Sequence, residues 1–390
     1  MPTIARERIA SIDLLKGLVM VIMALDHTRD YFHAYSYYHD PADPLFSSWP
    51  IFFTRWITHF CAPIFSFLAG LSAFFIGRRK SKAQLSVFLV KRGLWLVFIE
   101  LTIVAFAWRF DPAFTRNGLA VIWVLGVSMI ITAALIHLPR KILLAVSLAV
   151  IFGHNLLDNI QNDSLWWAVL HVRKSFPQSN GHVIGIGYPI IPWFAIMSLG
   201  YCFGEFYQPQ YDKAKRRKLF LQIGLLTCFS FFVLRFINVY GDPKDWTHFG
   251  TLSQRAIAFL DPAKYPPSLL YTLMTLGPAL IFLALAEDLK GKWVNFFSTY
   301  GRVPFFYYII HLYLIHIGAI VLAQLTGFGW RVMVNQKQFV TNIPELKGYG
   351  LSLPAVYLVW MIIILLTYPL CRIFEKYKLG NKDKWWLSYL

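Results

Sequence analysis

Ten apolar stretches of roughly membrane-spanning length constrain this 390-residue chain more than any other feature. A helix of about 20 apolar residues spans the hydrocarbon core of a bilayer. Because the connections leave no room for a separate soluble domain, the sequence predicts an all-α integral membrane protein of about ten transmembrane helices, folded as one domain over residues 1–390. The stretches lie near 13–33, 51–77, 88–108, 118–137, 141–156, 187–207, 218–238, 268–287, 304–324 and 351–373.

The net charge of +17 raises the question of a nucleic-acid partner, but the distribution of the charges indicates a membrane topology instead. Of the 37 Lys and Arg residues, 23 lie in segments toward one side of the membrane and 13 toward the other, and Lys16 completes the total. The positive-inside rule therefore predicts cytoplasmic termini. We expect a multi-pass protein of the cell membrane, of bacterial inner-membrane type, with lipids as partners and no nucleic acid.

The four cysteines, which form no CxxC pair, all fall within or at the ends of apolar stretches: Cys61, Cys202, Cys228 and Cys371. This pattern predicts buried free thiols and neither a disulfide framework nor a metal site.

The first stretch carries ionisable residues at depths where lipid tolerates few of them, namely Lys16, Asp26 and His27. Such groups usually face a cavity or a partner. Lys16 and His27 are eleven residues apart, which is three turns plus roughly 20° of an α-helix and a rise of about 16 Å. Both therefore lie on one stripe of the helix, with Met20 and Met23 between them.

His27 is the first candidate for proton transfer, because an imidazole can act as a general base near neutral pH. Asp26 is a second candidate, but adjacent residues on a helix point about 100° apart. Asp30, three residues further on, is the better partner for His27 on the same face. A histidine that only bonds another helix is the alternative interpretation.

Three further polar residues fall within or beside apolar stretches. Glu100 needs a partner, for which Lys16 and Arg92 are candidates. Arg302 lies at the cytoplasmic entrance of the ninth stretch, where it could meet a phosphate. His311 follows in the same stretch and either lines a cavity or bonds a neighbouring helix.

The loops assigned to the outer side are long and rich in aromatic residues, carboxylates and histidines. Such surfaces suit a sugar or glycolipid acceptor, and Tyr38, His39 and Trp246 are candidates to contact it. Interfacial belts and lids are the alternative role. The loops cover roughly 34–50, 157–186, 239–267 and 325–350.

Lys16-x10-His27, preceded by Asp13, resembles the [RK]-x10-H motif of acyltransferase family 3 membrane enzymes. The chain resembles the heparan-alpha-glucosaminide N-acetyltransferase-like family still more, in four segments spread over most of its length. They are residues 8–17 (RIASIDLLKG), 26–32 (DHTRDYF), 264–269 (KYPPSL) and 301–305 (GRVPF).

The resemblance implies a membrane acyltransferase that takes acyl-CoA, with acetyl the expected group, from the cytoplasm and acylates a sugar or glycolipid on the far side. It implies that Lys16, Arg78, Arg79 and Arg302 bind the anionic end of CoA. The pantetheine arm would then pass Met20 and Met23, and the thioester would end near His27.

The sequence leaves two candidates for the catalytic histidine, His27 and His39. In the lysosomal member of the resembled family, the position of His27 is an asparagine and the reactive histidine lies in the following loop, where His39 is the nearest match. Substrate contacts are expected from Tyr38, Trp246 and His311.

Two other classes of protein also fit parts of the sequence. A transporter or a lipid or glycan flippase would use the same buried charges as a relay, although no clear similarity between the two halves of the chain favours it. A non-catalytic membrane scaffold is the third class. The sequence is compatible with a homodimer.

Overall fold

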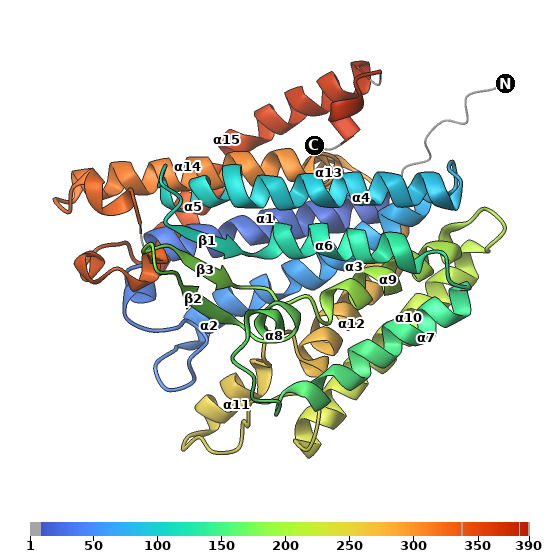
Figure 1. Cartoon of the computed structure of the whole chain (residues 1–390), viewed down its shortest axis with the longest axis horizontal. Coiled ribbons are helices and arrows are strands. Elements are labelled where there is room, and N and C mark those ends of the chain that lie inside the picture. Colours follow the sequence, from blue (N-terminus) through green and yellow to red (C-terminus); the bar gives the residue numbers. More distant parts are fainter. Residues whose placement is uncertain (1–8, 337, 382, 389–390) are drawn as a thin grey trace.

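The computed structural model describes residues 9–336, 338–381 and 383–388, and the chain is mostly helical (Figure 1). Arg6, Arg8 and Lys382, which the charge count assigns to the cytoplasmic side, lie outside these residues. The long helices are α1 Ala10–Phe32, α3 Cys61–Gly77, α4 Lys82–Ile99, α6 Val121–Leu135, α7 Arg140–Gly153, α9 Trp193–Phe203, α10 Lys213–Ile237, α12 Leu269–Leu285, α13 Lys292–Arg302, α14 Pro304–Leu325 and α15 Leu353–Gly380. The short helices are α2 Trp49–Trp56, α5 Ala105–Arg109, α8 Leu165–Leu170 and α11 Leu252–Leu260.

Each of the ten predicted stretches falls on helical segments. Six helical segments of the described chain are long and apolar enough to cross a membrane, namely Trp49–Gly77, Arg140–Leu157, Lys213–Ile237, Leu269–Asp288, Pro304–Leu325 and Leu353–Gly380. α1 is long enough as well, but every 18-residue window in it holds at least three of its five charged residues. α6 and α9 are apolar but shorter.

Several helices begin at a side chain that satisfies a free backbone amide. Ser81 and Gln84 form a reciprocal capping box at the start of α4. The Asp212 carboxylate accepts from the Lys215 N–H at the start of α10, and the Ser268 hydroxyl accepts from the Tyr271 N–H at the start of α12. These caps explain where the helices start after polar loops.

At four helix crossings, a glycine on each helix meets the backbone of the other helix. A Cβ at Gly17 would lie 1.8 Å from the Phe297 carbonyl oxygen, and one at Gly301 would lie 2.0 Å from the Asp13 carbonyl oxygen. Only glycine permits backbones to approach this closely. The pairs are Gly17 with Gly301 (α1 and α13), Gly70 with Gly200 (α3 and α9), Gly93 with Gly126 (α4 and α6) and Gly224 with Gly277 (α10 and α12).

Within the part of the chain that the structure describes, a small three-stranded sheet departs from the predicted all-α fold. It comprises β1 Arg116–Leu119, β2 Lys174–Pro177 and β3 Val183–Ile186 in the order β1-β3-β2, with β1 parallel and β2 antiparallel to β3. Figure 1 shows these strands left of centre, on the side away from the N-terminus. The strands are four residues long and lie within loops, so no alternating pattern was long enough to predict them.

α1 is the central helix of the bundle, and it packs against α3, α13, α14 and α15. Most of its buried apolar residues belong to one core that also includes residues of α3, α9, α12 and α14, while Tyr31 and Phe32 belong to a second core. Because α1 is unbroken from Ala10 to Phe32, Lys16 lies near one end and His27 near the other, on the stripe that the sequence predicts.

Candidate functional site

A hydrogen-bonded pair of histidines lies where α1 meets α14. His27 is half-buried, and its Nδ1 lies 2.8 Å from Nε2 of His311, whose side chain is fully buried. His311 Nδ1 lies 2.8 Å from the Tyr307 carbonyl oxygen, one turn earlier on α14. The bond between two helices that the sequence offered as one role for His311 is therefore present.

The carbonyl oxygen fixes the proton positions of both neutral rings. It can only accept, so the proton of His311 is on Nδ1 and its Nε2 accepts. The proton of His27 is then on Nδ1, and the lone pair of His27 is on Nε2. Among the described residues, none forms a hydrogen bond with that Nε2. The arrangement leaves a positioned imidazole with one nitrogen ready to accept a proton or react as a nucleophile.

Aromatic rings hold the pair in place. The Trp108 ring packs edge-on against His27 at 4.8 Å between centroids, and the two hydrogen-bonded histidine rings are nearly parallel, with centroids 5.0 Å apart. Tyr307 stacks on His311 at 4.9 Å between centroids. Since the flanking rings leave little room for rotation, the orientation of His27 is fixed before any substrate binds.

Neither Asp30 nor Asp26 is the partner of His27, so the predicted Asp30–His27 pair is wrong. Asp26 accepts hydrogen bonds from Arg55 Nη1 at 2.7 and 2.9 Å and forms an ion pair with Arg29 at 2.8 Å. Asp30 pairs with Arg29 at 2.6 Å. Arg29 is almost completely buried and forms ion pairs with both carboxylates.

Further polar and charged residues extend this group. Together they form what we call the outer polar cluster, named after the side of the membrane to which the sequence assigns these loops. His59 Nε2 lies 3.9 Å from the Asp261 carboxylate, which also accepts from Lys244 Nζ at 2.6 Å. Lys264 is buried and close enough to interact electrostatically with Asp26. The cluster comprises Asp26, Arg29, Asp30, Arg55, His59, Lys244, Asp261, Lys264 and Tyr265.

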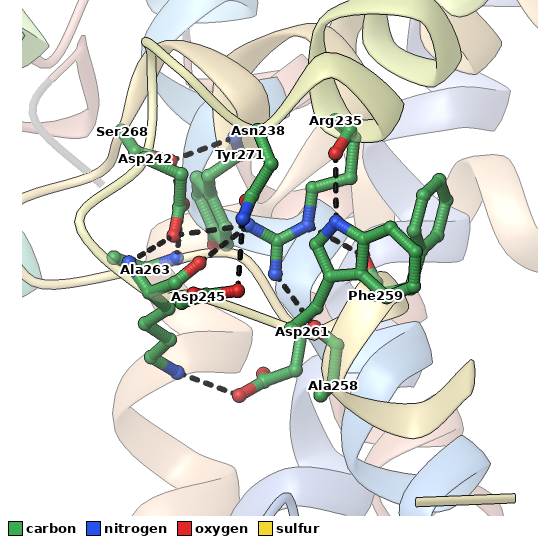
Figure 2. A network of polar contacts seen from close by, with 12 residues as sticks. Arg235, Asn238, Asp242, Asp245, Ala258, Phe259, Asp261, Ala263, Ser268 and Tyr271 are labelled. Carbon is green, nitrogen blue, oxygen red and sulfur yellow. Dashed lines mark hydrogen bonds and ion pairs between the residues drawn. The ribbon is translucent and has the colours of Figure 1, made fainter. Parts of the chain in front are cut away.

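A second network holds the loop that carries Lys264 and Tyr265. Figure 2 shows the buried Arg235 at its centre, where the guanidinium donates to the carbonyl oxygens of Ala258 and Phe259 at 2.6 and 3.0 Å. Asp242 accepts from the Ala263 N–H at 2.7 Å and the Ser268 hydroxyl at 2.5 Å. These bonds tie the loop to the ends of α10, α11 and α12.

Tyr265 is an unusually acidic phenol in this loop. Burial alone would raise its pKa, but the positive charges of Lys264 and Arg55 and a hydrogen bond with Tyr188 lower the pKa to about 8. The Arg173 guanidinium also lies over its ring, 4.6 Å from the centroid. Tyr265 can therefore donate or accept a proton at mildly alkaline pH.

A pocket of about 400 Å³ opens beside the outer polar cluster. Carboxylates dominate its polar lining, which includes Asp40, Asp43, Asp245 and Asp261, and Lys244 supplies one positive charge. His39 precedes Asp40, but its ring packs against Phe46 at 4.1 Å and Tyr35 at 5.4 Å. Within the described residues, the structure does not bring His39 into contact with the His27–His311 pair.

The predicted CoA-binding residues separate into two groups. Lys16 is half-buried and donates to Ser72 Oγ at 3.4 Å, whereas Arg78 and Arg79 are exposed in the turn after α3. Arg302 forms an ion pair with Glu375 of α15, so an anionic ligand there must compete with a carboxylate. All four lie away from His27, toward the other end of the bundle.

Met20 and Met23 lie on the stripe between Lys16 and His27, where their side chains are buried and pack against other residues of the hydrophobic core. Tyr38 is exposed in the loop after α1. Trp246 is built into the loop network, where its Nε1 donates to the Arg235 carbonyl oxygen at 2.8 Å. The contacts of these four residues with CoA or an acceptor stay predictions.

Glu100 has partners that differ from the expected Lys16 or Arg92. Its Oε2 accepts from the backbone N–H groups of Ile122 and Trp123 at 2.9 and 3.0 Å. These are free amides in the first turn of α6, where the helix dipole favours a negative charge. Glu100 is thus a link between two helices.

Of the outer polar cluster, the sequence pointed only to Asp26 and Asp30. The other seven residues were missed, among them Arg29, Arg55, Lys264 and Tyr265. Arg55 interrupts an apolar stretch, and the position of a charge inside such a stretch is a signal that could have found it. Lys264 and Tyr265 stood in one of the segments that carry the family resemblance, but nothing in their spacing placed them near Asp26.

A family model for the catalytic region of heparan-alpha-glucosaminide N-acetyltransferase matches residues 8–259. The chain belongs to this family. Its membership, together with the long apolar helices, identifies it as a multi-pass membrane acetyltransferase. The matched region contains His27, Asp26 and Arg55, while Lys264, Tyr265 and His311 follow it. Comparison with curated proteins gives no match.

Proposed function

We propose that this acetyltransferase moves an acetyl group from cytoplasmic acetyl-CoA to a sugar or glycolipid acceptor on the outer side of the membrane, with His27 as the reacting base. The observation that carries the proposal is the His27–His311 pair, because it leaves the Nε2 lone pair of His27 available. The acceptor nucleophile is a hydroxyl or an amino group.

The transfer can be written with His27 alone as proton carrier. His27 Nε2 takes the proton of the acceptor hydroxyl or amine as its oxygen or nitrogen attacks the thioester carbonyl. The C–S bond then breaks, and the CoA thiolate leaves and takes the proton from His27. His311 accepts from His27 Nδ1–H throughout and favours the protonated ring. Attack by His27 itself, through an acetyl-histidine, uses the same lone pair.

The proposed donor side is the Lys16 end of α1. Of the basic residues assigned to that side, Arg78 and Arg79 are exposed and available to phosphates, and Lys16 lies on the same stripe of α1 as His27. The proposed topology has ten membrane-crossing segments and cytoplasmic termini. It rests on the excess of Lys and Arg at this end and on the helices found at all ten apolar stretches.

The proposed acceptor side is the opposite end, where the long loops gather. The pocket lined by Asp40, Asp43 and Asp261 offers hydrogen-bond acceptors for sugar hydroxyl or ammonium groups. Tyr38 is exposed nearby in sequence and offers an aromatic face. Tyr265 of the outer polar cluster is a second group on this side that can exchange a proton near neutral pH, because its pKa is about 8.

A vesicle experiment tests both the activity and its direction. The purified protein is reconstituted in liposomes, acetyl-CoA is added to one side and a mixture of sugars to the other, and release of the CoA thiol is followed. We expect release that saturates with acetyl-CoA and requires acceptor on the opposite side. Release with both substrates confined to one side would contradict the proposed direction of transfer.

The competing class, a transporter or flippase, gives a different result in the same vesicles. It would move a sugar or lipid across the membrane without consuming acetyl-CoA. Well-folded protein that neither binds nor cleaves acetyl-CoA would overturn the acetyltransferase proposal for this chain.

A further inference from the structure

Two histidines and an aspartate meet in the outer loops, away from the His27–His311 pair. His154 follows the end of α7, Asp158 comes one turn later, and His171 directly follows α8. One ligand atom from each of the three lies within 4.8 Å of the others. His154 and His171 are 17 residues apart in the sequence. This spacing matches no metal-binding sequence motif, so only the fold brings the two histidines together.

Hydrogen bonds satisfy only some of the polar atoms in this group. His171 Nε2 lies 2.9 Å from Asp158 Oδ1, which is an ordinary histidine–carboxylate contact. His154, however, is buried, and neither of its ring nitrogens has a hydrogen-bond partner among the described residues. His171 Nδ1 is also buried without one. Buried polar atoms without protein partners are rare in native proteins and are often satisfied by a bound ion or water.

A hydrogen bond from Asn155 fixes the position of the Asp158 carboxylate, as neighbouring side chains often do for a carboxylate that binds a metal. Asn155 donates from Nδ2 to Asp158 Oδ2 at 2.8 Å, and its Oδ1 accepts from the Leu269 N–H at the start of α12 at 2.9 Å. The second carboxylate oxygen is thereby fixed, and Oδ1 points to His171. Such support of a ligating carboxylate is typical of metal sites.

We propose that His154, Asp158 and His171 bind one Zn²⁺ ion. Two imidazoles and a carboxylate form a ligand set that Zn²⁺ takes in proteins, with water as the fourth ligand. Asp158 is partly exposed and gives water and the ion a path to the site. Ligand atoms around tetrahedral Zn²⁺ lie about 3.3 Å apart, so small side-chain rotations close the present spacing.

The ion would tie together the ends of α7 and α8 and, through Asn155, the start of α12. Ligation uses the lone pair of one nitrogen of each histidine and replaces the hydrogen bond between His171 and Asp158. The proposal concerns folding and order of the outer loops, and it does not depend on the acetyl transfer.

Zinc binding by the whole protein is the direct test. Untagged protein in detergent is stripped with a chelator and equilibrated with Zn²⁺, and bound metal is measured by mass spectrometry. We expect one Zn²⁺ per chain, and at least tenfold weaker binding in His154→Ala, His171→Ala and Asp158→Asn. His248→Ala is the matched control, because it removes an exposed histidine that also pairs with an aspartate, Asp245. Equal binding in all variants would overturn the proposal.

A second measurement does not depend on the folding of variants. Co²⁺ added to the stripped wild-type protein should give the intense visible absorption of a four-coordinate nitrogen and oxygen site, and one equivalent of Zn²⁺ should remove it. The thermal midpoint of the wild type should rise with Zn²⁺. Wild-type protein that holds no stoichiometric Zn²⁺ and gives no such Co²⁺ spectrum would refute the site.

Discussion

Nδ1 of His27 donates its proton to Nε2 of His311 across the contact between α1 and α14, over 2.8 Å. Because His311 donates in turn to the Tyr307 carbonyl oxygen, a backbone group on α14 determines which nitrogen of His27 is free. The residue that the sequence placed first for chemistry is therefore oriented by a residue 284 positions away.

Replacement of His311 by alanine should lower the rate of acetyl transfer without removing the base itself. His27 would lose the acceptor that fixes its tautomer and orientation, and misplacement of a catalytic group costs about 10²-fold in rate. The measurement is kcat for CoA release, with KM for acetyl-CoA unchanged. His316→Ala is the control, since His316 is also buried in α14 but bonds Ala107 and Met333 carbonyl oxygens. Equal losses in both variants would indicate a general packing defect.

Asp26→Asn should destabilise the protein strongly. The substitution leaves Arg29 and Arg55 without their shared carboxylate charge in a nearly closed site. Removal of one member of a buried ion pair costs about 3–5 kcal/mol. Thermal unfolding in detergent measures the effect, and the double variant Asp26→Asn/Arg55→Gln should recover part of the loss. A single variant as stable as the wild type would show that the cluster contributes little.

Gly17→Ala should disturb the crossing of α1 with α13. The added Cβ would lie 1.8 Å from the Phe297 carbonyl oxygen, which belongs to the backbone and cannot rotate away. Overpacking of this kind costs about 1–3 kcal/mol. Gly380→Ala on α15 is the matched control, because a Cβ there meets nothing within 4 Å. The two thermal midpoints should differ, with only the Gly17 variant lowered.

Tyr265 should make stability depend on pH in the alkaline range. Its pKa is about 8 in the folded protein, because Lys264 and Arg55 outweigh the effect of burial, and about 10 in an unfolded chain. The unfolded state holds the proton longer, so this group adds stability as pH rises from about 8 to 10 and adds none below 8.

Ultraviolet absorbance of tyrosinate during a pH titration checks this expectation. One tyrosine should ionise near pH 8 in the wild type, and Tyr265→Phe should remove that step. Lys264→Gln should move it upward. A wild-type titration with no tyrosine below pH 9 would contradict the assignment.

The positions of the helices could be predicted from the sequence, because apolar stretches bounded by polar loops leave few alternatives. The shared stripe of Lys16 and His27 followed from helix geometry alone, and the unbroken α1 preserves it. The small sheet could not be predicted, since four-residue strands within loops carry no periodic signal.

The partners of the buried charges could not be read from local spacing. Helix periodicity favoured Asp30 as the partner of His27. In the structure, Asp30 instead forms an ion pair with Arg29, and Asp26 forms one with Arg55. The Glu100 carboxylate likewise accepts hydrogen bonds from backbone amides of α6. No sequence pattern of side chains predicts such a backbone partner. Pairs that depend on tertiary packing, such as His27 with His311, require the arrangement of helices to be known first.

The central claim is that His27, rather than His39, carries out the proton transfer. The most direct test is the rate of CoA release from acetyl-CoA by His27→Ala and His39→Ala proteins in liposomes, each checked for folding. We predict that His27→Ala loses about 10²- to 10⁴-fold in rate, while His39→Ala keeps activity within a few-fold of the wild type. Loss of release in His39→Ala together with retained release in His27→Ala would contradict the account.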